Sequence, residues 1–298
     1  AKYGKDDERI VALDADLSGS TKSAIFGKAC PERFLNVGIA ESNMVGMAAG
    51  LASVGKIPFV NTFTVFLTTL GLCAARAFGS YSQLPIKFAG AYGGMSDAFD
   101  GPSHHALEDI AVMRSLANMQ VFVPCDAVQT EWLVKYAIDT PKPIYLRLSR
   151  DKFKDLYTSE TEFAPGKGIV VREGTDITVI ACGLMVGNAI DAAEELAKEG
   201  ISVRVVDMFS IKPIDEALIV RCAKETGAIV SAEEHNIYGG LGSAVAEVLT
   251  KHGCGVTQGF VGVNDCHGEC GPYKKLLAKY GLDANAIANK VRETLAKK

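Results

Sequence analysis

One carboxylate in an otherwise apolar stretch is the first candidate for chemistry in this chain. Glu41 follows a short apolar run at 34–39 and opens a segment of small residues with a helical pattern. A second apolar run at 57–60 is followed by Phe63 and Phe66. In a parallel sheet the ends of such strands meet at one edge, where ligands bind. A carboxylate and a phenyl face at that edge suit a flat, basic heteroaromatic ligand, because the acid can hydrogen-bond a ring nitrogen and the phenyl ring can stack.

The same residues also have a purely structural interpretation. An acid in the first turn of a helix is favoured by the helix dipole, so Glu41 could act on stability alone. Phe63 and Phe66 share the spacing i, i+3, i+4 and i+7 with Leu67 and Leu70, which is the buried stripe of a helix predicted over 63–79. From the residues alone, both interpretations stay open.

Short motifs in this sequence resemble the transketolase family, in the order and approximate spacing found there. They are Gly38-Ile-Ala-Glu-Ser-Asn-Met44, Asn61-Thr-Phe-Thr-Val-Phe66, Asp100-Gly-Pro-Ser-His-His-Ala-Leu-Glu-Asp109 and Val123-Pro-Cys-Asp-Ala127. The resemblance runs from about Ile10 to Val291 and covers the pyrimidine-binding and C-terminal domains of that family. The family's larger N-terminal domain, with its Gly-Asp-Gly metal motif, has no counterpart in this sequence. The resemblance therefore implies one half of a split transketolase.

The resemblance implies thiamine diphosphate as the cofactor and assigns roles at matching positions. Glu41 would act in catalysis by donating a hydrogen bond to nitrogen N1′ of the aminopyrimidine ring. Phe66 would stack on that ring, and Phe63 would line the same pocket. Thr69 stands where the family sometimes has a third aromatic residue. The diphosphate and its metal, Mg²⁺ or Ca²⁺, would be bound by a partner subunit.

The resemblance also implies a site for the sugar substrate. Asp100 would bond a substrate hydroxyl, and His104, the second residue expected in catalysis, would reach the sugar and its phosphate. Arg150 would bind that phosphate by a charge-assisted fork, and Ser20 would contribute a hydroxyl. Tyr92 replaces a phosphate-contacting histidine found in many members of the family. Taken singly, each of these residues is equally consistent with a solvated loop.

Apolar strands alternate with helical patterns along the whole chain, which predicts an α/β protein with parallel sheets covered on both faces. With the resemblance, this becomes two three-layer α/β/α domains: a pyrimidine-binding domain over residues 1–150 and a transketolase C-terminal domain over 166–298. Residues 151–165 are polar and unpatterned, as in a linker. The loop 92–105 is unusually long and carries two histidines and two aspartates, which favours a functional role.

A glycine-rich segment in the second half has two interpretations. Gly239, Gly240 and Gly242 precede a predicted helix and could cradle an anion. The spacing is not that of a nucleotide-binding fingerprint, so close packing of loop and helix is favoured. The nearby His235 could be a capped loop residue; the resemblance favours a subunit interface instead.

Composition narrows the class of protein. The 298 residues are 48% hydrophobic and 22% charged, as in globular proteins that fold without disulfides. A net charge of −4 argues against a nucleic-acid partner. There is no run of about 18 apolar residues to span a membrane and no secretion signal. Eight scattered cysteines, several in apolar segments, suggest free thiols in a reducing cytoplasm. Cys266 and Cys270 resemble half a metal site or a redox pair, but no second ligand pair is evident.

The implied reaction is transfer of a two-carbon ketol unit from a ketose phosphate to an aldose phosphate, as in the pentose phosphate pathway. The implied assembly contains two N-terminal subunits and two copies of this chain. Two alternatives of the same superfamily are a portion of 1-deoxy-D-xylulose-5-phosphate synthase and the β subunit of a 2-oxoacid dehydrogenase. The motif at 100–109 favours transketolase over both. A third alternative is a non-catalytic assembly or regulatory module. It is disfavoured because all the expected site residues are present together: Glu41, Phe66, Asp100, His104 and Arg150.

Overall fold

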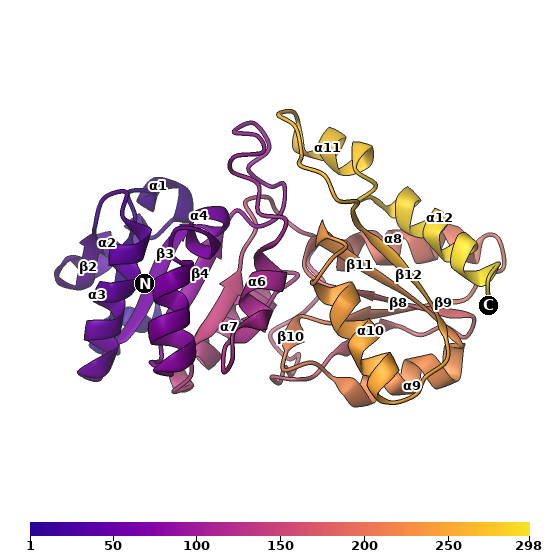
Figure 1. The fold of residues 1–298 in the computed structure, drawn as a ribbon, viewed down its shortest axis with the longest axis horizontal. Helices are drawn as coiled ribbons and strands as arrows, with labels where there is room; N and C mark the ends of the chain where they lie inside the picture. Colours follow the sequence, from indigo (N-terminus) through magenta and orange to yellow (C-terminus); the bar gives the residue numbers. More distant parts are fainter.

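Two β-sheets organise the chain, and helices cover both faces of each (Figure 1). The computed structural model describes residues 1–298. The first sheet has seven strands in the order β10-β5-β6-β4-β3-β1-β2, and the second has five in the order β12-β11-β8-β9-β7. The predicted architecture of two α/β domains is confirmed. None of the helices has both the length and the apolar character that a bilayer crossing requires.

The first half of the chain supplies six strands of the first sheet and the helices around it. The strands are β1 (Ile10–Asp14), β2 (Phe34–Asn36), β3 (Ile57–Phe63), β4 (Lys87–Ala91), β5 (Gln120–Phe122) and β6 (Ile144–Arg147). The helices are η1 (Tyr3–Lys5), α1 (Ser18–Thr21), α2 (Ala24–Ala29), η2 (Pro31–Arg33), α3 (Glu41–Ser53), α4 (Thr64–Thr68), α5 (Leu72–Ala74), η3 (Ala75–Tyr81), α6 (Asp109–Ser115) and α7 (Ala127–Asp139).

The second half builds the smaller sheet and lends one strand to the first. Its strands are β7 (Ile169–Arg172), β8 (Ile177–Ala181), β9 (Val203–Asp207), β10 (Ser210–Lys212), β11 (Ala228–Asn236) and β12 (Thr257–Val263). Its helices are α8 (Leu184–Ala197), α9 (Glu216–Thr226), α10 (Leu241–Lys251), α11 (Tyr273–Lys279) and α12 (Ala284–Leu295). Helices α8 and α12 cover one face of the second sheet, and α9 and α10 cover the other (Figure 1).

The sheets are parallel except at two edges. β10 pairs antiparallel with β5, and β7 pairs antiparallel with β9. An antiparallel edge strand on an otherwise parallel sheet is common in α/β folds. Because β10 follows β9 in sequence, the second half of the chain completes the edge of the first sheet, which the strand pattern did not predict.

The helix predicted over residues 41–53 is confirmed, but the prediction of a helix over 63–79 is wrong. α3 spans the predicted residues and buries its small side chains against β3. Residues 63–79 do not form one helix: β3 continues to Phe63, which pairs with Ala91 on β4. The helix that follows is broken at Gly71, where a Cβ would lie 2.7 Å from the Leu67 carbonyl oxygen. Leu70 is 57% exposed, so the predicted buried stripe does not extend to this residue, although Phe63 and Leu67 are buried.

The glycine-rich segment serves packing rather than anion binding. β11 runs through Asn236, and the Glu233 carboxylate accepts hydrogen bonds from the backbone N–H groups of Leu241 (2.7 Å) and Gly242 (2.8 Å) at the start of α10. A Cβ on Gly240 would lie 2.0 Å from that carboxylate. The chain thus fills this helix N-terminus with its own acid.

His235 lies at the contact between the two halves of the chain. Its ring is completely buried, and Nε2 faces the backbone N–H of Ala111 on α6 at 3.4 Å. The expectation of a subunit-interface residue is therefore wrong, because the chain itself covers this side chain.

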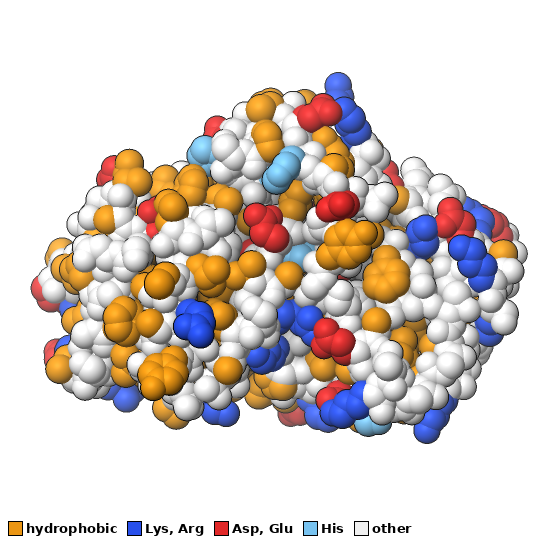
Figure 2. All heavy atoms as spheres, viewed as in Figure 1, with side chains coloured by type: hydrophobic (Ala, Val, Ile, Leu, Met, Phe, Trp, Pro, Cys, Tyr) orange, Lys and Arg blue, Asp and Glu red, His pale blue; other side chains and the backbone are white.

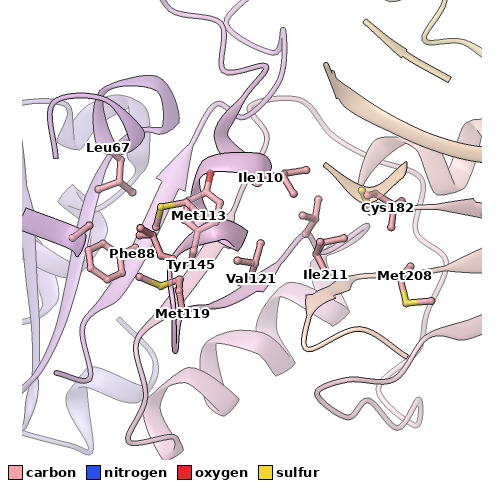
Figure 3. Close-up of a cluster of buried hydrophobic side chains, with 14 of the residues drawn as sticks. Leu67, Phe88, Ile110, Met113, Met119, Val121, Tyr145, Cys182, Met208 and Ile211 are labelled. Atoms are coloured by element: carbon pink, nitrogen blue, oxygen red, sulfur yellow. The ribbon is translucent and has the colours of Figure 1, made fainter. Parts of the chain in front are cut away.

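One hydrophobic core runs through both halves. Tyr145 and Val121 of the first sheet and Met208 and Ile211 of the second half belong to the same buried cluster (Figure 3). Continuous burial of this kind ties the two halves together, because separating them would expose apolar surface to water.

A single buried carboxylate anchors the segment that joins the two halves. Asp126 caps α7 through the backbone N–H of Gln129 (2.8 Å). Its other oxygen accepts hydrogen bonds from the backbone N–H groups of Leu156 (3.1 Å) and Tyr157 (2.8 Å). Asp126 therefore fixes the path of the connecting segment as well as the start of a helix.

We expect Asp126→Ala to lower the free energy of unfolding by about 3 kcal/mol, because it removes a helix cap and two further hydrogen bonds to a charged group. The matched control is Asp283→Ala, since Asp283 only caps α12, through Ala286; about 1 kcal/mol is expected there. Urea unfolding measures both values, and limited proteolysis between 151 and 165 should accelerate only in Asp126→Ala. Equal losses in the two variants would contradict the anchoring role.

Candidate functional site

Glu41 is a buried acid whose partner is missing from the chain. It is 3% exposed at the first position of α3, just beyond the carboxyl end of β2. No side-chain hydrogen bond or ion pair of the structure involves its carboxylate, and the carboxylate oxygens are not among the fully enclosed polar atoms. A carboxylate that has no partner in the chain and still reaches solvent is available to bond a ligand.

The two phenylalanines lie at the same edge of the sheet. β1 separates β2 from β3, so the strand leading to Glu41 and the strand ending in Phe63 lie roughly 10 Å apart. Phe63 is 5% exposed, whereas Phe66, on α4, is only partly buried. A flat ligand between the acid and the Phe66 ring could touch both.

An aromatic row extends from α4 across the sheet edge. The rings of Phe63 and Phe66 are stacked with centroids 6.1 Å apart, and Tyr92 stacks on Phe63 at 4.5 Å. The guanidinium of Arg150 lies over the Tyr92 ring, 5.1 Å from its centroid. Tyr92 has a left-handed backbone conformation, with φ +61°. The residue that replaces the expected histidine thus links the phenylalanines to the arginine.

His104 joins this row from the long loop. Its ring meets Phe66 edge-on at 5.2 Å and Phe63 at 6.1 Å. Nδ1 lies 2.9 Å from the Ser103 hydroxyl. The structure therefore brings together Phe63, Phe66 and His104, which come from two segments far apart in sequence.

Asp97 holds Arg150 in place and was not singled out from the sequence. Its Oδ1 accepts a hydrogen bond from Arg150 Nη1 at 2.8 Å, and its Oδ2 is buried without a partner. Burial and the neighbouring Asp100 raise the pKa of Asp97, and Arg150 opposes that rise. Asp100 itself is exposed at the surface of the loop. In the sequence, Asp97 is an acid three residues before Asp100 and lies outside every recognised motif, so nothing marked it as a functional residue.

Ser20 is positioned near this edge of the first sheet by the buried side chain of Asp14. It lies on the short helix α1, which is anchored by the fully buried Asp14 through the Leu17 N–H (2.6 Å) and the Thr21 hydroxyl (2.7 Å). Leu17 packs against the cluster that contains Phe63. Ser20 is thus near the aromatic row, but its side chain forms no hydrogen bond with the other predicted site residues.

The chain matches two family descriptions over nearly its full length. "Transketolase, pyrimidine binding domain" matches residues 1–155, and "Transketolase, C-terminal domain" matches residues 166–287. The chain belongs to the transketolase family. The resemblance inferred from the motifs is thereby confirmed, and the chain is a transketolase subunit.

Relatives of similar length carry related descriptions. "Putative transketolase C-terminal section" of Methanocaldococcus jannaschii is 42% identical over 99% of this chain and 93% of the relative. "6-deoxy-6-sulfo-D-fructose transketolase subunit SqwH" of Clostridium sp. (strain MSTE9) is 39% identical over 100% of this chain and 92% of the relative. A solved structure described as "Split gene transketolase, inactive beta4 tetramer" is 48% identical, with a TM-score of 0.90, over 99% of this chain and 94% of the other.

The pyrimidine-binding domain implies thiamine diphosphate, and the residues present fit its aminopyrimidine end. Glu41 offers a buried carboxyl group that lacks a partner, and Phe66 offers a partly exposed ring. No group of three or more histidine, cysteine or acidic side chains is arranged to hold a metal ion, and Cys266 and Cys270 are free and exposed.

We expect Arg150→Gln to destabilise the protein more at pH 8 than at pH 5. Without the cation, the pKa of the buried Asp97 rises further above its value of about 4 in the unfolded chain. The folded state then binds the proton more tightly, so its stability falls as pH rises through that window. The extra loss should be on the order of 1 kcal/mol, because Arg150 is half exposed and water screens the pair.

Urea unfolding at the two pH values measures this difference. The double variant Arg150→Gln/Asp97→Asn is the control, since it has no carboxylate to titrate and should lose the additional pH dependence. A loss of equal size at both pH values in the single variant would contradict the coupling.

Proposed function

We propose that this chain is the C-terminal subunit of a split transketolase, which transfers a two-carbon ketol unit from a ketose phosphate to an aldose phosphate. The observation that carries the proposal is the buried carboxyl group of Glu41, which has no partner in the chain and lies at the same sheet edge as Phe63 and Phe66. An aminopyrimidine ring would supply both a hydrogen-bonding nitrogen for the acid and a face for the phenyl ring.

The residues of this chain have separate tasks in the proposed reaction. Thiamine diphosphate, when bound, supplies a nucleophilic thiazolium carbon that cleaves the bond beside a ketone. Glu41 would hold a proton at the pyrimidine nitrogen, and Phe66 would stack on the ring. Asp100 and His104 orient the sugar hydroxyls from the long loop, and Arg150 binds the anionic end of the sugar.

Exposed apolar side chains on the first half of the chain support a partner subunit. Hydrophobic side chains gather on the visible face of the first half of the chain, whereas the outer end of the second half carries more charged ones (Figure 2). Ile39, two residues before Glu41, is 82% exposed, and Leu70 (57%) and Tyr81 (85%) are exposed on the segments after β3. Exposed apolar side chains of this kind mark interaction surfaces. We infer that an N-terminal subunit covers this surface and binds the diphosphate with Mg²⁺ or Ca²⁺.

The assembly we propose contains two N-terminal subunits and two copies of this chain. The relative whose structure is described as a split gene transketolase, an inactive tetramer of β chains, supports this proposal, because there four such chains associate and the assembly is inactive. The pairing of unlike subunits would complete the cofactor site at their contact.

For the substrate, we propose sugar phosphates of the pentose phosphate pathway. Arg150 has a half-exposed guanidinium that can form a fork with a phosphate. One relative is described as acting on a sulfonated sugar. Sulfonate and phosphate are both anionic, so a guanidinium suits either, and a comparison of 6-sulfonated and 6-phosphorylated fructose as donors separates them.

We expect ketol transfer only when the chain is mixed with its N-terminal subunit and thiamine diphosphate. In that complex, Glu41→Gln should lower kcat on the order of 100-fold or more, because proton transfer by a positioned side chain contributes that much. Assembly, followed by size-exclusion chromatography, should not change. Glu32→Gln is the matched control: Glu32 is an exposed acid of the same domain, paired with Arg33, and full activity is expected.

Two results would overturn this function. Ketol transfer by the isolated chain would contradict the split active site, and full activity of Glu41→Gln would favour a non-catalytic module. Decarboxylation of pyruvate by the complex would instead favour 1-deoxy-D-xylulose-5-phosphate synthase or a 2-oxoacid dehydrogenase.

A further inference from the structure

The connections of the second sheet reverse direction at one point, and in open α/β sheets the crevice at such a point usually binds ligands. β9 lies on one side of β8 and β11 on the other, so the order of connections reverses between β8 and β11. In open α/β sheets, ligands bind outside the carboxyl ends of the strands at such a point. The carboxyl end of β11 carries Glu233, Glu234 and His235, and Glu233 and His235 have the packing roles described above.

In this protein the first half of the chain occupies that crevice. The Glu234 carboxylate accepts a hydrogen bond from the backbone N–H of Met95 at 2.7 Å. A Cβ on Gly94 would lie 2.3 Å from the Glu234 carboxyl carbon, and Gly94 has a φ of +69°, so the backbone approaches closely. The side chains of Met95, Ala98 and Leu107 belong to the core of the second half. The long loop is thus bound as a ligand would be.

A second loop of the C-terminal half holds the outer part of the same loop. The backbone N–H of Gly271 donates to the carbonyl oxygen of Ala98 at 3.1 Å. A Cβ on Gly101 would lie 2.3 Å from the sulfur of Cys270, and a Cβ on Gly268 would lie 2.4 Å from the His105 ring. Cys270 thus has a packing role against the loop. The two loops lie side by side at the top of Figure 1.

We propose that Glu234 is a positioning residue: it holds residues 93–106 in the crevice of the second sheet and thereby fixes Asp100 and His104 for the sugar substrate. The proposal rests on the proposed function for its last step only. The C-terminal half, which contributes none of the predicted site residues, then acts as the support of the substrate loop.

The surroundings of Glu234 suit a fixed acceptor. The side chain is 3% exposed. Arg147 on β6, Asp109 on α6 and Tyr273 on α11 are the titratable groups that face it from neighbouring elements. Burial raises the pKa of Glu234 to about 7, and Arg147 opposes that rise. The Met95 N–H requires an acceptor oxygen at the right distance, so the reach of the Glu234 side chain is what holds the loop.

Two conservative variants of the isolated chain separate the effect of the length of the Glu234 side chain from the effect of its charge. Glu234→Gln keeps the length and an acceptor oxygen, whereas Glu234→Asp keeps the carboxylate but is one methylene shorter. Hydrogen–deuterium exchange of peptides covering 93–106 should accelerate about tenfold or more in Glu234→Asp, as expected for loss of a buried hydrogen bond, and less than about threefold in Glu234→Gln. The matched control is Glu233→Asp, which should accelerate exchange at the start of α10 instead.

This first measurement needs no partner subunit, so it tests whether Glu234 holds residues 93–106 even if the proposed function fails. Wild-type exchange over 93–106 in Glu234→Asp, or equal acceleration in Glu233→Asp, would overturn the proposal. Faster exchange in Glu234→Gln than in Glu234→Asp would do the same.

The second measurement uses the active complex with its N-terminal subunit. Glu234→Asp should lower kcat/KM for the ketose phosphate about tenfold, while the affinity for thiamine diphosphate, followed by fluorescence quenching, stays within about twofold. Glu234→Gln should restore most of the donor kcat/KM. An unchanged donor kcat/KM, or a parallel loss of cofactor affinity, would contradict positioning of the substrate loop.

Discussion

The fold depends on one buried guanidinium at the contact between its two halves. Arg147, at the end of β6, donates to the Asp109 carboxylate at 2.7 and 3.1 Å and to the carbonyl oxygens of Ala106 (3.1 Å) and Glu234 (2.8 Å). Burial alone would lower the pKa of Arg147, but Asp109 more than offsets this and raises it, so the side chain stays charged. Breaking a buried ion pair by removing one partner is strongly unfavourable. One side chain therefore joins β6, α6, the base of the long loop and β11.

This junction explains how a loop of some fourteen residues, on which we propose that the substrate binds, can be ordered. Its base is closed by reciprocal backbone hydrogen bonds between Gly94 and Ala106, at 3.0 and 2.9 Å. Arg147 holds one side of this base, and the end of β11 holds the other. The sheet edge of the first half presents Glu41, Phe63 and Phe66 without help from the loop, whereas Tyr92 and His104 belong to the loop itself. The residues proposed for the cofactor and those proposed for the substrate are thus positioned largely by different parts of the fold.

Sequence patterns predicted the elements whose signals are local. The α3 helix begins and ends at the predicted residues because a run of small residues separates two apolar strands. The segment after β3 was mispredicted because its helical spacing competes with pairing to β4, which extends the strand through Phe63. The edge strand β10 has only three residues, Ser210–Lys212, too few to show a period, and its partner β5 lies about ninety positions earlier in the chain. Short elements of this kind are fixed by distant neighbours rather than by their own residues.

The sequence alone determined the family, the α/β class and a set of candidate site residues. These depend on short motifs and on the alternation of strands and helices, which can be recognised in the sequence without coordinates. Those candidate roles stay predictions, although the structure places Phe63, Phe66 and His104 in contact and leaves Glu41 buried without a partner. Only the tertiary structure revealed Asp97 and Glu234. Each is an ordinary acid in the sequence, and its role comes from burial beside a group that folding brings close: Arg150, 53 positions away, and the Met95 amide, 139 positions away. Such contacts leave no local period, so no pattern in the sequence could have predicted them.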